Sequence, residues 1–229
     1  MTNTLPLLVR QKPRGWWPMA IGAAMIASYG FLFLFLGEKL FSAELAESFR
    51  ARSLALYTHV FFAAIALAIG PLQFHRGLML RRRALHRTLG KIYVVAAIAG
   101  GGLAGLYMAS YSFGGLVTHL GFGTLAVLTG TTTVIAYIRI RGRQVAAHRE
   151  WMIRSYALIF AAVMLRILLP LLIIAYQGEF APAYSWISWL CWVPNLLFAE
   201  WHIRGSRRAQ QEWMQAGIPG VQAGHLVKR

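Results

Sequence analysis

Four of the seven histidines occupy matched positions inside or just before successive apolar segments of the chain. His59 lies about five residues inside the second apolar run, and His119 lies about as far inside the fourth. His86 precedes the third run by six residues, and His148 precedes the fifth by seven. If successive runs cross a membrane in opposite directions, His59 and His119 share a depth near one face. His86 and His148 then share a depth near the other.

Paired imidazoles at two depths suggest metal chemistry. Ionisable groups at membrane depth are costly and usually functional, and two facing neutral imidazoles are the common axial ligands of a low-spin haem iron. The fifteen residues from His59 to Phe74 correspond to ~22 Å of helix, so two haems at these depths could pass electrons across a bilayer. Taken singly, each histidine fits a satisfied or interfacial residue better than a ligand, and the prediction of haem ligation rests on the two depth-matched pairs.

Small residues continue the helical stripe below three of the four histidines. Such stripes give room to a flat macrocycle, but they also allow membrane helices to pack closely without any cofactor. The positions four, seven and eleven residues beyond each histidine are Ala63, Ala66 and Gly70; Gly90, Tyr93 and Ala97; Gly123, Ala126 and Gly130; and Met152, Ser155 and Ile159.

Arg166 is a charged residue in the middle of the fifth apolar run, where it requires a partner. It follows His148 by eighteen residues, or five helical turns, so both residues lie on one side of the helix. We expect a haem propionate, a tyrosine or Asn195 to satisfy it, with Arg87 and Arg149 as further propionate partners. Pro170 frees the backbone carbonyl of Arg166 and predicts a kink.

The remaining histidines carry weaker predictions. His75 follows the second run and is interpreted as a loop histidine, with a spare ligand or proton-relay group as the alternative. His202 and Glu200 lie near the end of the sixth run, where we expect a salt-bridged helix end with Arg204. His225 carries no functional signal.

The elements that must position these residues are six apolar runs of about twenty residues. Each is long enough to cross a hydrocarbon core of ~30 Å as a helix. Apolar residues make up 58% of the chain and charged residues 13%, with a mean hydropathy of +0.53, so we predict an all-α integral membrane protein. The runs are Pro18–Leu36, Leu54–Phe74, Ile92–Phe113, Leu116–Ile138, Ser155–Tyr176 and Ser185–Ile203.

The net charge of +16 is concentrated on one side of the predicted membrane. Of the 23 basic residues, 19 lie in the segments Met1–Gly15, His75–Lys91, Arg139–Arg154 and Arg204–Arg229. Short Lys- and Arg-rich loops stay in the cytoplasm, which predicts six spans with both termini inside. The basic blocks are therefore interpreted as topology signals that touch anionic lipid, and not as a nucleic-acid surface.

We expect three parts in the chain: a cytoplasmic N-terminal segment at 1–17, a six-helix membrane domain at 18–203, and a basic cytoplasmic tail at 204–229. Within the membrane domain, helices two to five are expected to form a four-helix bundle. Phe41, Leu45 and Phe49 suggest a short surface helix in the outer loop, and 211–229 is expected to be loose. No cleavable signal peptide is apparent, and a lone Cys191 excludes an internal disulfide framework.

Three motifs resemble a family of bacterial inner-membrane proteins known mainly as a domain of unknown function. They are GPLQF (Gly70–Phe74), LRRRALHRTLGKIYV (Leu80–Val94) and HREWMIRSYAL (His148–Leu158). The resemblance implies a location in the bacterial inner membrane, and it implies no activity.

A second resemblance is to the two-haem transmembrane cytochromes b of the ascorbate-dependent and ferric-reductase kind, which have six helices with one histidine on each of the four central ones. It implies His59 with His119 at an outer haem and His86 with His148 at an inner haem. No ascorbate-binding signature and no G-x-G-x-x-G fingerprint is present. Electrons would therefore come from quinol, a small reductant or a redox partner protein.

The predicted function is transmembrane electron transfer through two bis-histidine b-type haems. A cofactor-free transporter or proton-coupled carrier is the first alternative, in which Arg166, His59 and His119 line a polar path and Pro170 provides a gate. A structural or assembly subunit of a membrane complex is the second, and the sequence is compatible with an oligomer. With no Asp, one Cys and no paired carboxylates, hydrolase chemistry is not expected.

Overall fold

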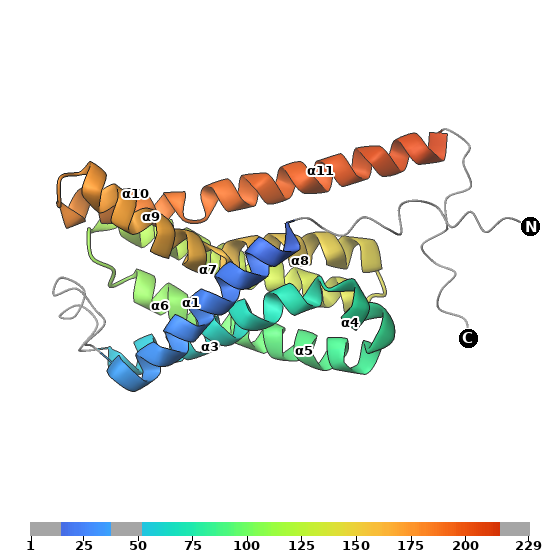
Figure 1. The fold of residues 1–229 in the computed structure, drawn as a ribbon, viewed down its shortest axis with the longest axis horizontal. Helices are drawn as coiled ribbons and strands as arrows, with labels where there is room; N and C mark the ends of the chain where they lie inside the picture. The colour runs from blue at the N-terminus through green and yellow to red at the C-terminus, as the bar shows by residue number, and fades with distance from the viewer. Residues whose placement is uncertain (1–14, 38–51, 216–229) are drawn as a thin grey trace, which may run out of the picture.

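The computed structural model describes residues 15–37 and 52–215, and within these ranges the chain is helical with no strand (Figure 1). The expected surface helix around Phe41, Leu45 and Phe49 lies outside the described residues. The elements are α1 (Trp16–Leu36), α3 (Ser53–Gln73), α4 (Arg76–Arg81), α5 (Arg83–Ala96), the π-helix η3 (Ala97–Ala104), α6 (Gly105–Ala109), α7 (Leu116–Arg141), α8 (Val145–Ile159), α9 (Ala161–Ala175), α10 (Phe180–Leu190) and α11 (Val193–Gln215).

Among the described residues, five helices are long and apolar enough to cross a membrane, which confirms a multi-pass helical membrane protein. They are Trp16–Leu36, Ser53–Gln73, Arg83–Ala109, Leu116–Arg141 and Val145–Ala175. The third joins α5, η3 and α6, and the fifth joins α8 and α9. Helices form here because lipid offers no hydrogen bonds, so each segment must satisfy its own backbone.

The sixth apolar run is not one continuous helix, contrary to expectation. It is divided between α10 and α11, with a turn at Cys191 and Trp192. Pro194 has no backbone N–H and cannot extend the helical ladder of α10, which favours a break at this point. The prediction of a loose segment is wrong for residues 211–215, because α11 continues to Gln215.

The helices pack as sequential neighbours. α3 packs against α1, α5 and η3; η3 packs against α7; α7 packs against α8; and α8 returns to contact α3. α11 contacts α8 and runs alongside it, and its last turn lies toward the same end as α4 and the first turn of α1 (Figure 1). The first turn of α1 and the last turn of α11 thus lie toward one end of the helices (Figure 1).

Glycine allows the closest approach between helices at η3. A Cβ added at Gly100 would lie 2.7 Å from the backbone nitrogen of Ala63 and 2.7 Å from the Cβ of Phe62, both on α3. On the other side, a Cβ at Gly102 would meet the Cα of Gly130 on α7 at 3.4 Å. The three glycines at 100–102 therefore let α3 and α7 pack on either side of the π-helix.

A proline and a tyrosine connect α3 to α8. Pro71 lacks a backbone N–H, so the carbonyl of Leu67 receives no helical hydrogen bond from that position. The Tyr156 hydroxyl donates to this carbonyl at 3.2 Å. Gly70 makes the contact sterically feasible, because a Cβ there would lie 1.9 Å from the Tyr156 ring.

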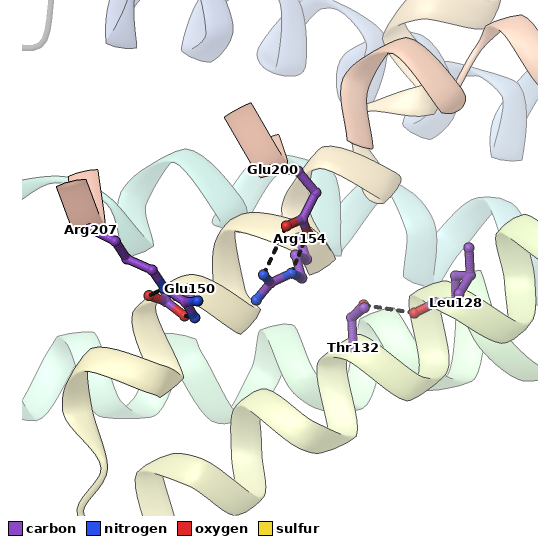
Figure 2. Close-up of polar contacts among 6 residues, drawn as sticks. All are labelled: Leu128, Thr132, Glu150, Arg154, Glu200 and Arg207. Carbon is purple, nitrogen blue, oxygen red and sulfur yellow. Dashed lines mark hydrogen bonds and ion pairs between the residues drawn. The ribbon is translucent and has the colours of Figure 1, made fainter. Parts of the chain in front are cut away.

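Two ion pairs hold α11 on α8 (Figure 2). Arg154 donates to both carboxylate oxygens of Glu200 at 2.5 and 3.0 Å, and Arg207 pairs with Glu150. The expected pairing of Glu200 with Arg204 is therefore replaced by a bond to a different helix.

Gly100→Ala is expected to destabilise the protein by about 1–3 kcal/mol, because the new methyl group has to displace backbone atoms of α3. The measurement is unfolding of the purified protein in detergent. Gly205→Ala on α11 is the matched control: nothing lies within 4 Å of its added Cβ, so the exchange should stabilise the helix by up to about 1 kcal/mol. Equal stability of Gly100→Ala and wild type would contradict the close packing.

Tyr156→Phe is expected to cost about 1 kcal/mol, because the carbonyl of Leu67 loses its donor. In a Pro71→Ala background the restored N–H can bond to that carbonyl, so the same exchange should cost measurably less. The two costs are compared in a double-mutant cycle, with Tyr137→Phe as the control at an exposed tyrosine. An identical cost in both backgrounds would show that Tyr156 does not replace the missing helical bond.

Candidate functional site

The three sequence motifs meet at the end of the helices that carries the basic loops. Gln73 ends α3, His86 and Gly90 lie on successive turns of α5, and His148 lies on the first turn of α8. A Cβ added at Gly90 would meet Oε1 of Gln73 at 3.2 Å, and His86 and His148 lie within electrostatic range of each other. We call Gln73, His86 and His148 the inner cluster.

His148 has a defined tautomer in this cluster. Its Nδ1 lies 2.8 Å from the carbonyl oxygen of Ala136 on α7. A carbonyl can only accept, so Nδ1 carries the hydrogen and the neutral ring keeps a lone pair on Nε2. Histidines that ligate metals commonly have this arrangement, with one ring nitrogen donating to a carbonyl and the other free for the metal.

Two polar atoms of the inner cluster are buried and have no hydrogen-bond partner within residues 15–37 and 52–215. They are Nδ1 of His86 and Nε2 of Gln73, whose residue is only 8% exposed. Buried polar groups are nearly always paired, so each unpaired atom requires an explanation. Our reading of the sequence assigned no role to Gln73, although an amide at the end of an apolar run within a motif was an available signal.

The outer histidines bond to two different carbonyls, and neither bond joins the pair. His59 Nδ1 donates to Gly100 of η3 at 2.8 Å, which leaves a lone pair on Nε2 as in His148. His119 instead donates from Nε2 to Ser112 at 2.9 Å, within the turn between α6 and α7. His119 therefore stabilises a turn in this structure, and its free lone pair lies on Nδ1.

The small residues expected to make room for a macrocycle are in contact with neighbouring helices. Gly100 and Gly102 lie against α3 and α7, and Gly70 lies under the ring of Tyr156. The space beneath His59 is thus occupied by protein atoms. His59, His86 and His148 each have a ring nitrogen that could ligate a haem iron. The close packing beneath His59 and the bond from His119 to Ser112 disfavour a haem between His59 and His119.

A buried hydroxyl network lies between the two histidine layers. Ser155 on α8 bonds to the Tyr93 hydroxyl of α5 at 2.8 Å and to Thr133 of α7 at 2.7 Å. Thr133 also donates to the carbonyl of Thr129, and Thr132 donates to Leu128, as Figure 2 shows for the latter. The network joins three helices, and the run Thr131–Thr133 was its signal in the sequence.

Arg166 lies on α9 with its side chain exposed on the outside of the helix assembly. Its guanidinium lies over the ring of Tyr29 on α1, at 5.8 Å from the centroid, and within electrostatic range of His59. A tyrosine was one of its expected partners. Asn195 was also expected to satisfy Arg166, but its amide instead donates to the carbonyls of Ala157 and Cys191.

The other predicted residues lie at the surface. Arg87 and Arg149 are exposed, as is His202 on α11. His75 is exposed and caps α4, where its Nδ1 accepts from the backbone of Leu78 at 3.2 Å, in accord with a loop histidine. His225 lies outside the described residues. Within 15–37 and 52–215, no group of three or more His, Cys, Asp or Glu side chains could hold a metal ion.

Comparisons with known proteins give one finding. A family model described as "Predicted membrane protein (DUF2306)" matches residues 56–203. No curated protein and no solved structure matches the chain. The matched range extends from α3 into α11 and includes all three motifs and all four paired histidines. Because the match covers more than half of the sequence, the chain belongs to this predicted membrane protein family, DUF2306.

Proposed function

We propose that this protein transfers electrons across the bacterial inner membrane through two b-type haems. In this proposal the chain has six spans with both termini in the cytoplasm, and helices two to five form a four-helix bundle. His86 and His148 hold the inner haem, and His59 and His119 hold the outer one. The haem iron would supply the one-electron chemistry.

The arrangement of the four helices supports this proposal. Because α3, α5 with η3, α7 and α8 contact one another in sequence and α8 returns to α3, the first and third of these elements are diagonal, as are the second and fourth. His59 and His119 therefore lie on one diagonal pair of helices, and His86 and His148 lie on the other. Cofactor sites in bundle cores are built from side chains on facing helices, and these opposed pairs meet that description.

The observation that carries the proposal is the tautomer of His59 and His148. Both donate from Nδ1 to a backbone carbonyl of a neighbouring helix, and both keep the Nε2 lone pair that a metal requires. A third imidazole is available in half-buried His86, whose buried Nδ1 has no hydrogen-bond partner among the described residues. The inner pair is consequently the better supported site, and the outer one requires His119 to leave Ser112 or to ligate through Nδ1.

The remaining residues would act as supports. The carbonyls of Ala136 and Gly100 orient the rings of His148 and His59, and Arg166 provides a positive charge beside His59 for an acidic group. The chain shows no nucleotide-binding fingerprint, so quinol, a small reductant or a redox partner protein would be the source of electrons.

A reduced-minus-oxidised absorption spectrum tests the proposal on protein expressed with ample haem. We expect a sharp α band, a shifted Soret peak and about two haems per chain. His86→Ala and His148→Ala should each reduce this to about one haem, by removing an inner ligand.

His75→Ala and His202→Ala are the controls for those variants, because both histidines are exposed, and they should leave the spectrum unchanged. A flat spectrum from folded, haem-supplied protein contradicts the proposal. If the same preparation contains a fixed membrane partner, an assembly subunit becomes the better description.

A second candidate, a cofactor-free or proton-coupled carrier, rests on Arg166. Its charge is exposed at membrane depth beside Tyr29, and Pro170 lies one turn further along α9. Carriers commonly place ionisable residues on a polar path, although they usually include carboxylates, and α9 contains none.

Proton flux into liposomes separates the two candidates. The electron-transfer proposal expects wild-type protein to give no more flux than empty liposomes under an imposed membrane potential. Flux that is present in wild type, absent in Arg166→Gln and retained in Arg141→Gln would favour the carrier, because Arg141 is an exposed arginine at the end of α7.

A further inference from the structure

A groove of about 260 Å³ opens on the outside of the protein between α3 and α5. Its lining presents only apolar atoms, which include the aliphatic stem of one lysine. The lining residues are Phe62, Ile65, Lys91, Ile92, Val95 and Ala96. α3 and α5 both belong to candidate spans, so the groove faces the hydrocarbon of the bilayer. An apolar channel at this depth is suited to a hydrocarbon chain.

A basic stripe leads into the groove. Arg83, Arg87 and Lys91 follow one another at a spacing of four on α5, and all three side chains are exposed. Residues separated by four lie on the same face of a helix, so these charges form a row on one side of α5. No acidic residue occurs between His75 and Lys91, and the row therefore has no carboxylate from its own segment to neutralise it.

The direction of the lysine side chain connects the groove and the stripe. Side chains on a helix lean toward its N-terminus, which for α5 is the end with Arg83. Lys91 lies about 12 Å along the helix from that end, so its ammonium group leans from the apolar groove toward Arg87 and the membrane surface. A ligand held here would have an apolar part in the groove and an anionic part beside the stripe.

We propose that this groove binds an anionic phospholipid, with one acyl chain along α3 and α5 and the phosphate at Lys91 and Arg87. Charge decides between the amphiphiles that could enter. A quinone has an apolar tail but a neutral head, which does not neutralise a row of three cations. The site lies on the surface of the protein and does not depend on the proposed haems.

Native mass spectrometry of the full chain in detergent tests the proposal, with phosphatidylglycerol and phosphatidylcholine of the same acyl chains as probes. We expect phosphatidylglycerol to stay bound and phosphatidylcholine to dissociate. Lys91→Gln should weaken binding of phosphatidylglycerol about fivefold, the usual effect of one basic residue at a membrane surface. Val95→Trp should also reduce it, because the indole fills the groove without changing the charge.

Arg141→Gln removes an equally exposed charge from the end of α7 and is the matched control, with no change expected. Both groove residues are exposed, and Ile92→Trp supplies a second way to fill the groove if Val95→Trp does not fold. Equal weakening by Lys91→Gln and Arg141→Gln would reduce the effect to general charge attraction and overturn the proposal. The proposal would be overturned in favour of a quinone site if a neutral quinone displaced the lipid and Lys91→Gln changed the binding of neither the lipid nor the quinone.

Discussion

The structure depends on one constraint: backbone carbonyls inside a bilayer must find donors without water. At several places a side chain from another helix supplies one, and in three of these bonds the donor belongs to the motifs or to the histidine pairs. Tyr156 donates to the carbonyl that Pro71 leaves open, His59 donates to the carbonyl of Gly100 in the π-helix, and His148 donates to that of Ala136. Each bond crosses from one helix to its neighbour. Residues that could carry chemistry therefore also hold the helices in place.

This double use has a consequence for function. A carbonyl acceptor decides which ring nitrogen keeps its hydrogen, so the packing of η3 and α7 also sets the tautomers of His59 and His148. The glycines that allow this packing occupy space beneath His59 that a macrocycle would need. At the inner cluster the helix packing leaves polar atoms without partners among the described residues and is compatible with a bound cofactor. At His59 and His119 the packing fills the space, and His119 is bonded to its own turn.

Basic residues have different partners at the end of the helices and at mid-span. At the end that carries the basic loops, Glu200 neutralises Arg154 and Glu150 neutralises Arg207. Both pairs join α11 to α8, the helix with which α11 makes most of its contacts. Lys91, by contrast, is exposed and has no carboxylate within its own basic segment. Deeper in the bilayer Arg166 has an aromatic ring as its neighbour, which stabilises a cation more weakly than a carboxylate does.

Periodicity and charge in the sequence were enough to determine the helical class, the membrane location, five of the spans and the family, because hydropathy and motifs are local properties. The same information placed His59, His86, His119 and His148 on successive long helices. Tertiary structure alone decided what each polar group bonds to: Glu200 reaches Arg154 on α8 and not Arg204, Asn195 bonds to backbone and not to Arg166, and His119 bonds to its own turn. It also decided the π-helix at 97–104 and the break at Cys191. These features depend on contacts between residues far apart in the chain, and a spacing along one helix does not specify which neighbour will face it.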